Sequence, residues 1–203
     1  MLILESMTPE SLLGIGVGLA LAAAAGFRVF VPLLVLSLAA RTGWVELSPS
    51  FAWLATTSAS VALATAMVLE IAAYYVPFFD NLLDTLAAPV AVLAGIVASA
   101  SVLTDLPPWL QYSIAIIGAG GTAGVVHAST SLLRLKSSAA TAGFGNPILA
   151  TLELGGSLAI ALLAVLAPLL ALAAVALMVW MVARRVTARR LANARDAAES
   201  STR

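Results

Sequence analysis

Long apolar segments separated by short polar breaks run along almost the whole chain. Each is predicted to be a helix, since about 20 apolar residues are long enough to cross a bilayer. The pattern predicts an all-α fold, a polytopic membrane helix bundle of about six transmembrane helices. The approximate segments are 12–39, 51–76, 89–103, 109–133, 147–166 and 168–183.

The last two segments are separated by a single proline. From Pro147 to Arg184 the chain is apolar throughout, and one straight helix of that length would span roughly 55 Å, nearly twice the hydrocarbon thickness. Pro168 is the only helix breaker in this stretch, so the chain is predicted to turn there. Pro147 should occupy the first turn of its helix, where its missing N–H costs nothing.

The region 77–103 is open to two interpretations. Asp80 and Asp84 are spaced i, i+4 and share one face of a short amphipathic piece, either as a solvated surface or as a vestibule that attracts cations. The apolar piece from Pro89 is short for a span. It either crosses the membrane, giving six spans, or 77–103 enters the membrane and returns, giving five. We favour six.

Composition agrees with a membrane protein whose main partner is the lipid bilayer. The chain is 62% hydrophobic and 10% charged, whereas soluble domains average about 25% charged residues. It has no cysteine and a single histidine, so disulfides, iron–sulfur clusters and zinc sites are not expected, nor any other metal or cofactor. The abundance of alanine and arginine is typical of a bacterial genome.

The basic residues predict orientation. Six of the arginines lie in 184–203, and Arg134 and Lys136 fall in a polar loop that precedes the last hairpin. By the positive-inside rule these regions are expected on the cytoplasmic side of a bacterial plasma membrane. Residues 1–186 then form the transmembrane domain and 187–203 a basic tail. Nothing beyond this tail supports nucleic-acid binding, so no nucleic-acid partner is expected.

Six spans divide into two groups of three, 12–106 and 109–186. Shifting the chain by 100 residues superimposes Gly18–Gly43 on Gly118–Gly143 with seven identities. Repeats with an odd number of spans have opposite topologies, as in many small-solute transporters, so an inverted repeat is predicted.

Among the residues of the apolar segments, Arg28 has the highest free-energy cost of burial in a bilayer. A charge at the bilayer centre costs about 2.5–3.5 kcal/mol or more. Arg28 either reaches the interface or, as we favour, faces the bundle interior beside a carboxylate or an anion. Pro32 removes a backbone hydrogen bond and can kink or break the helix beside this charge.

Two glutamates and the histidine are the other candidate binding residues. Glu153 lies about 9 Å inside its segment, which favours a pairing or functional role. Glu70 precedes Tyr74 and Tyr75, so it is either buried or an interfacial residue beside an aromatic belt. His127 is interpreted as a hydrogen-bonded packing residue rather than a proton carrier.

Glycines at small-xxx-small spacing predict close helix packing. Gly120 and Gly124 form one such pair, and faces of this kind also permit self-association into a homo-oligomer. Asn146 and Pro147 mark the break that opens the segment 147–166.

Two motifs, "EIAAYYVPFFDNLLDTLAAP" and "SSAATAGFGNPILATLE", resemble a bacterial membrane family catalogued as domain of unknown function 4126. The resemblance covers about 12–185 and implies a membrane location and a shared fold, but no established activity. Family members often carry charged residues at four positions that differ here. These positions hold Tyr74, Tyr75, Ala88 and Leu154.

These observations favour a small-solute or ion transporter or channel. Arg28 would be its charge centre, Glu153 a counter-ion or cation site, and the Asp80–Asp84 face an entrance. The alternative is a non-transporting scaffold or lipid-handling accessory protein, in which Arg28 and Glu153 pair for structure. An enzyme is not expected, because the chain has no metal motif and no Ser–His–Asp set.

Overall fold

The structure is a computed structural model that describes residues 8–75 and 79–171, together with residues 173, 177, 180 and 184; for 79–85 it describes the backbone alone. Every regular element in these ranges is a helix, which confirms the predicted all-α fold. The elements are α2 (Pro9–Phe27), α3 (Phe30–Arg41), the 3₁₀-helix η1 (Pro49–Ala55), α4 (Thr57–Tyr74), α5 (Phe79–Val102), α6 (Pro108–Ser113), the π-helix η2 (Ile114–Ala119), α7 (Gly120–Thr141) and α8 (Asn146–Leu166).

Four helical segments are long and apolar enough to cross a membrane. One of them joins α6, η2 and α7 into a single run of 34 residues. The four segments are Pro9–Phe27, Thr57–Tyr74, Pro108–Thr141 and Asn146–Leu166. They identify the chain as a membrane helix bundle, as its composition predicts.

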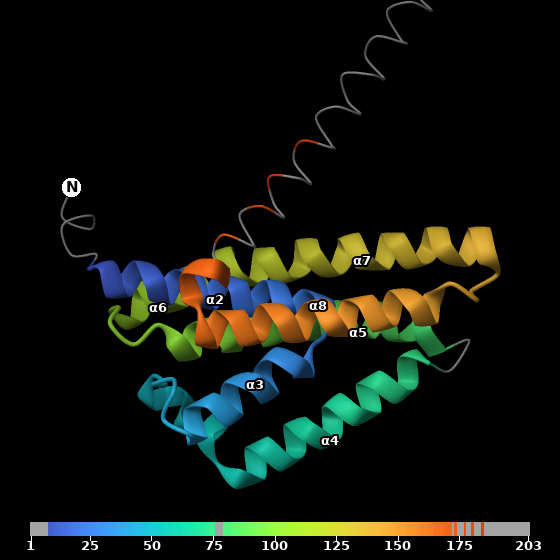
Figure 1. The fold of residues 1–203 in the computed structure, drawn as a ribbon. Coiled ribbons are helices and arrows are strands. Elements are labelled where there is room, and N and C mark those ends of the chain that lie inside the picture. The colour runs from blue at the N-terminus through green and yellow to red at the C-terminus, as the bar shows by residue number, and fades with distance from the viewer. Residues whose placement is uncertain are drawn as a thin grey trace, which may run out of the picture.

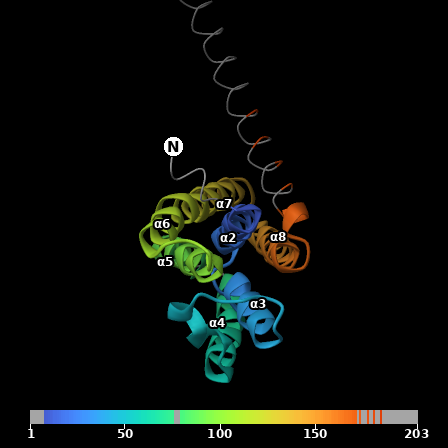
Figure 2. The same cartoon turned by 90° about the vertical axis from the view of Figure 1, so that its left-hand side faces the viewer.

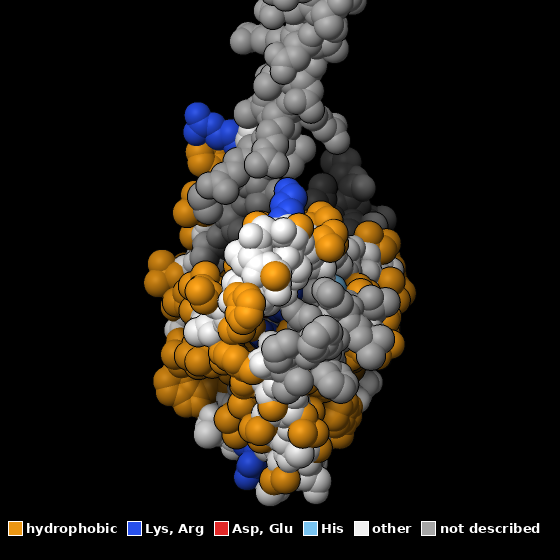
Figure 3. Space-filling model, turned by 90° about the vertical axis from the view of Figure 1, so that its right-hand side faces the viewer, with side chains coloured by type: hydrophobic (Ala, Val, Ile, Leu, Met, Phe, Trp, Pro, Cys, Tyr) orange, Lys and Arg blue, Asp and Glu red, His pale blue; other side chains and the backbone are white. Residues whose placement is uncertain are grey.

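Helix α2 lies at the centre of this bundle, and α5, α7 and α8 pack around it (Figure 2). Its buried positions are mostly small, with Ala20 and the run 22–25 fully buried. Large apolar side chains face outward instead, among them Leu69 at 64% and Ile117 at 77% exposure. The end of the molecule in Figure 3 is largely hydrophobic, with basic side chains at only a few places. Small residues inside and large apolar residues outside are typical of helices packed in lipid.

The first apolar segment is two helices rather than one. Helix α2 ends at Phe27, and α3 begins at Phe30 and runs back at an angle to pack beside α4 (Figure 1). Pro32 lies in the first turn of α3, where no N–H is required; in a continuous helix its ring would clash with the carbonyl of Arg28. The predicted break beside Arg28 is confirmed, and the single segment 12–39 is wrong.

A second difference concerns Pro89, where a helix boundary was expected. Helix α5 runs through this residue without interruption for 24 residues, about 36 Å. Packing of α5 against α2 and α7 maintains the helix, since neighbouring helices make proline tolerable in membrane spans. The backbone does not reverse between residues 79 and 102, as a re-entrant segment would require. The side chains of Asp80 and Asp84 lie outside the described residues, so their vestibule stays a prediction.

The polar loop expected at 134–146 is much shorter than predicted. Helix α7 continues to Thr141 and ends where Ala142 and Gly143 adopt positive φ angles of 51° and 88°. Polarity marks where a segment leaves lipid, whereas a helix ends only where the backbone is broken, as it is here. Arg134 is consequently a helical residue, which corrects its assignment to a loop.

At the end of α8 the helix is interrupted at Ala167, immediately before Pro168, which confirms the predicted break. Most of the segment 168–183 and all of the basic tail 187–203 lie outside the described residues. The inverted repeat of 12–106 and 109–186 stays a prediction.

Candidate functional site: a buried arginine cluster at a helix break

Arg28 is at the point where α2 ends, and its side chain is 1% exposed. Its Nη2 group donates a hydrogen bond of 2.9 Å to the carbonyl oxygen of Ala150 on α8. The same nitrogen lies 3.6 Å from Oε2 of Glu153, one turn further along α8. The structure therefore brings together the arginine and one of the two glutamates that the sequence offered as partners.

A second arginine shares this carboxylate. Arg134 of α7 is 3% exposed; its Nε donates to Oε1 of Glu153 at 3.1 Å, and its Nη2 donates to Oε2. Arg134 lies seven residues before the end of α7 and Glu153 seven after the start of α8, so both are about 10 Å along this hairpin from its loop. The position is therefore about two helical turns inside the bundle from this end.

Tyr74 completes the group from α4. It is the last residue of that helix and is 5% exposed. The guanidinium carbons of Arg28 and Arg134 each lie over its ring, 4.0 Å from the centroid. A cation over an aromatic face contributes about 0.5–2 kcal/mol, and more when water is excluded. The arginine cluster is thus formed by Arg28, Tyr74, Arg134 and Glu153, from four different helices.

Glu70 has a different place beside this cluster. Its two carboxylate oxygens accept hydrogen bonds from the backbone N–H groups of Val29 at 2.9 Å and Phe30 at 3.2 Å. These are the first N–H groups of α3, which no carbonyl within that helix can satisfy. A carboxylate also interacts favourably with the positive end of a helix dipole. Glu70 therefore stabilises the helix break at which Arg28 lies.

The donors of Arg28 are only partly used. A guanidinium carries five N–H groups, and Nη2 accounts for two of them. Neither Nε nor Nη1 of Arg28 has a hydrogen-bond partner among the described residues, so three N–H groups are buried without an acceptor. An unsatisfied buried donor costs about 1–3 kcal/mol, and more when it is charged. This is the feature of the cluster that points to a ligand.

An apolar hollow of about 430 Å³ lies beside the cluster, between α4 and α5. Tyr74 and Glu70 line it, together with Val29, which follows Arg28 in the chain. Apolar side chains form the rest of its wall, namely the aromatic Phe30 and the aliphatic Ala66, Leu69, Ala73, Leu86, Ala87 and Val90. Its volume is within the range of ordinary ligand pockets, about 300–1,000 Å³.

His127 is buried on α7 but lines another hollow, of about 460 Å³, with Pro89 of α5. Gly124 also lines this hollow, and a Cβ on it would lie 3.4 Å from Val92. A Cβ on Gly120 would lie 3.1 Å from Ile96. These two glycines therefore face α5 of the same chain.

The break before α8 has the local structure that its residues favour. Pro147 lies in the first turn of that helix, as predicted. Asn146 is buried, and its Nδ2 donates a 2.8 Å hydrogen bond to Oγ of Ser138 on α7. This contact fixes the start of the helix that carries Glu153.

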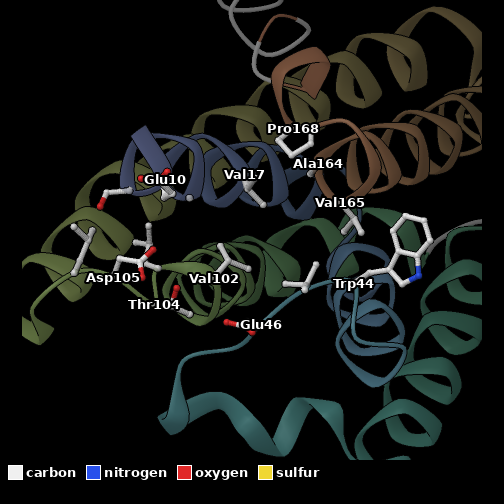
Figure 4. Close-up of a pocket in the computed structure, with 15 residues that line it drawn as sticks. Glu10, Val17, Trp44, Glu46, Val102, Thr104, Asp105, Ala164, Val165 and Pro168 are labelled. Atoms are coloured by element: carbon white, nitrogen blue, oxygen red, sulfur yellow. The ribbon is translucent and has the colours of Figure 1, made fainter. Parts of the chain in front are cut away.

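Another hollow, of about 240 Å³, lies near the start of α2, at the other end of the bundle (Figure 4). Its lining includes the acidic residues Glu10, Glu46 and Asp105 and the exposed Trp44. No group of three His, Asp or Glu side chains in the described ranges is arranged to hold a metal ion. The acidic hollow carries no further feature that indicates a ligand.

The sequence reasoning did not find Arg134 or Tyr74. Arg134 was counted as a loop charge, and Tyr74 as part of an interfacial aromatic belt. The signal for Arg134 was its register, because Ala123, His127 and Thr130 precede it at helical spacing on the buried face of α7. Tyr74 has no comparable signal, since its contacts depend on where α4 packs.

A bundle of apolar helices around a central small-residue helix, with ionised groups buried between the helices, defines this protein as a polytopic helical membrane protein. Within that class, the family model described as domain of unknown function (DUF4126) matches residues 15–188, and the chain belongs to this family. No curated protein and no solved structure matches the chain.

Proposed function

We propose that this protein is a membrane transport protein for a small solute or ion, with the arginine cluster as its substrate site. The observation that carries the proposal is the buried guanidinium of Arg28 at a broken helix, where three of its N–H groups have no acceptor in the part of the chain that the structure describes. Intramembrane ionised residues most often mark solute or ion pathways. Broken helices supply binding groups in many transporters.

The arrangement of the cluster supports movement coupled to binding. Its four side chains come from α2, α4, α7 and α8, so a ligand that changes their contacts changes how these helices are held together. Arg28 and Glu153 are almost fully buried, which corresponds to an occluded site. The proposal also places the protein in a bacterial plasma membrane, with its C-terminus in the cytoplasm. It includes no enzymatic activity and no cofactor.

Flux measurements in proteoliposomes test this function. The purified chain would be assayed for uptake of radiolabelled rubidium, chloride and methanesulfonate. Arg28→Gln and Glu153→Gln should each lower the observed flux at least about tenfold, because each removes a charged hydrogen-bonding group worth about 1.5–3 kcal/mol. Arg41→Gln is the matched control, since Arg41 is exposed at the end of α3. Flux in both cluster variants equal to that of the control would contradict the proposal.

A structural role in a scaffold or lipid-handling accessory protein is the second candidate. It is favoured by the buried ion pair of Arg134 and Glu153, which joins α7 to α8. Exchanging the two residues in the double variant Arg134→Glu/Glu153→Arg distinguishes the candidates. Recovery of both folding and cellular phenotype would assign the pair to structure, whereas recovery of folding without flux would assign it to transport.

A further inference from the structure

We propose that the arginine cluster binds an organic anion, whose charged group contacts the unpaired N–H groups of Arg28 and whose apolar part lies in the hollow between α4 and α5. The inference rests on the proposed function for its site, and it names the chemical class of the ligand.

The charged part follows from the donors. Nε and Nη1 of Arg28 can only donate hydrogen bonds, so their ligand must supply acceptors. Glu153 accepts hydrogen bonds from Nε and Nη2 of Arg134, and both oxygens of Glu70 accept hydrogen bonds from the backbone of α3. Neither glutamate accepts a hydrogen bond from Nε or Nη1 of Arg28. A carboxylate, sulfonate or phosphate group presents the acceptors that guanidinium groups bind best.

The apolar part follows from the hollow. Tyr74 is common to both regions, because its ring contacts the guanidinium of Arg28 and also lines the 430 Å³ hollow. Val29 lines the hollow as well and is the neighbour of Arg28 in the chain. Arg28 itself does not line the hollow, so the proposal places the anion beside Tyr74 and Val29, between the guanidinium and the aliphatic side chains. Burial of one CH₂ group contributes about 0.8 kcal/mol, so an apolar substituent should add affinity.

Binding of two alkylsulfonates to the purified full chain tests the proposal. Sulfonates stay ionised at neutral pH, so they do not cross the bilayer as neutral acids. Hexanesulfonate should bind the wild-type protein at least about tenfold more tightly than methanesulfonate, measured by titration calorimetry in detergent. Equal affinity for the two, or binding of neither, would overturn the proposal.

Variants separate the two parts of the ligand. Arg28→Gln should weaken both sulfonates about tenfold or more, and Arg28→Lys, which keeps the charge, should weaken them less. Ala73→Phe fills the hollow and should reduce the preference for hexanesulfonate, while Ala72→Phe, on the exposed side of α4, should leave it unchanged. A ligand-free melting temperature shows that each variant is folded. A preference unaffected by Ala73→Phe would overturn the assignment of the hollow.

Two further arms identify the source of the anion and separate this proposal from transport. In nanodiscs, competition of anionic phosphatidylglycerol with hexanesulfonate would assign the site to a bilayer lipid, and no competition would assign it to a soluble anion; both results support an organic anion.

Sulfonate binding without flux of any solute would contradict transport and support this inference. Flux of rubidium with no sulfonate binding would support transport and contradict this inference.

Discussion

Arg28 shows how a charged residue is accommodated inside an apolar bundle. Its guanidinium contacts the ring of Tyr74 on α4, and it contacts a backbone carbonyl and the edge of a shared carboxylate on α8. Breaking a buried ion pair costs about 3–5 kcal/mol, because it leaves an uncompensated charge. The partners of Arg28 are therefore requirements of folding as well as of any binding function.

Glu70→Gln tests the residue that stabilises the helix break. The glutamine would retain one acceptor for Val29 and Phe30, but its NH₂ group would face a backbone N–H, and the negative charge at the α3 N-terminus would be lost. We expect a loss of about 1–2 kcal/mol in the free energy of unfolding, measured by denaturation in detergent. Glu46→Gln on an exposed loop is the control and should change stability by less than about 0.5 kcal/mol. Equal effects of the two substitutions would show that the contact does not stabilise the break.

At the scale of helices, the position of α2 depends on glycines that allow close approach. A Cβ on Gly26 would lie 2.6 Å from the carbonyl oxygen of Ala123 on α7, and one on Gly18 would lie 2.4 Å from Oγ of Ser99 on α5. Gly26 is two residues before Arg28. The crossing of α2 and α7 at this point therefore determines how close Arg28 comes to Arg134.

Gly26→Ala should destabilise the protein by about 1–3 kcal/mol, because a backbone atom of α7 must move to admit the methyl group. The matched control is Gly121→Ala on α7, where a new Cβ has nothing within 4 Å. That substitution should be neutral or stabilise by up to about 1 kcal/mol through helix propensity. Thermal unfolding of both variants in the same detergent gives the comparison. A stability of Gly26→Ala equal to that of Gly121→Ala would contradict the close crossing.

The sequence predicts single helices, and ionised residues that are unfavourable in a bilayer, better than it predicts contacts between helices. Arg28 and Glu153 could be selected because an ionised residue in an apolar segment is unfavourable wherever it lies. The break beside Arg28 follows from the local chemistry of Pro32, four residues later. The burial of Arg134 agrees with its register on α7, whereas Tyr74 lies at the end of α4, where aromatic rings are common, and only the packing of that helix shows that it is buried.

At the scale of the whole molecule, the continuous helix from Pro108 to Thr141 limits how the protein can lie in a membrane. Its 34 residues extend about 51 Å, well beyond a hydrocarbon core of about 30 Å. Such a helix extends beyond the core by about 20 Å in total unless it is strongly tilted. Its two ends also lie at opposite ends of the bundle (Figure 1).

Because the chain has no cysteine, single cysteines can report which side of the membrane each end faces. Trp109→Cys lies at the start of this helix and Phe144→Cys in the loop after it, at positions that are 60% and 87% exposed. With a cytoplasmic C-terminus, a membrane-impermeant maleimide should label Trp109→Cys in right-side-out vesicles and Phe144→Cys in inside-out vesicles. Labelling of both from one side would contradict a membrane-spanning helix. Labelling of Trp109→Cys in inside-out vesicles and of Phe144→Cys in right-side-out vesicles would retain the span and invert the orientation. The arginine cluster would then lie nearer to the outer surface than to the cytoplasmic surface, because it is about 10 Å from the Phe144 end of the α7–α8 hairpin.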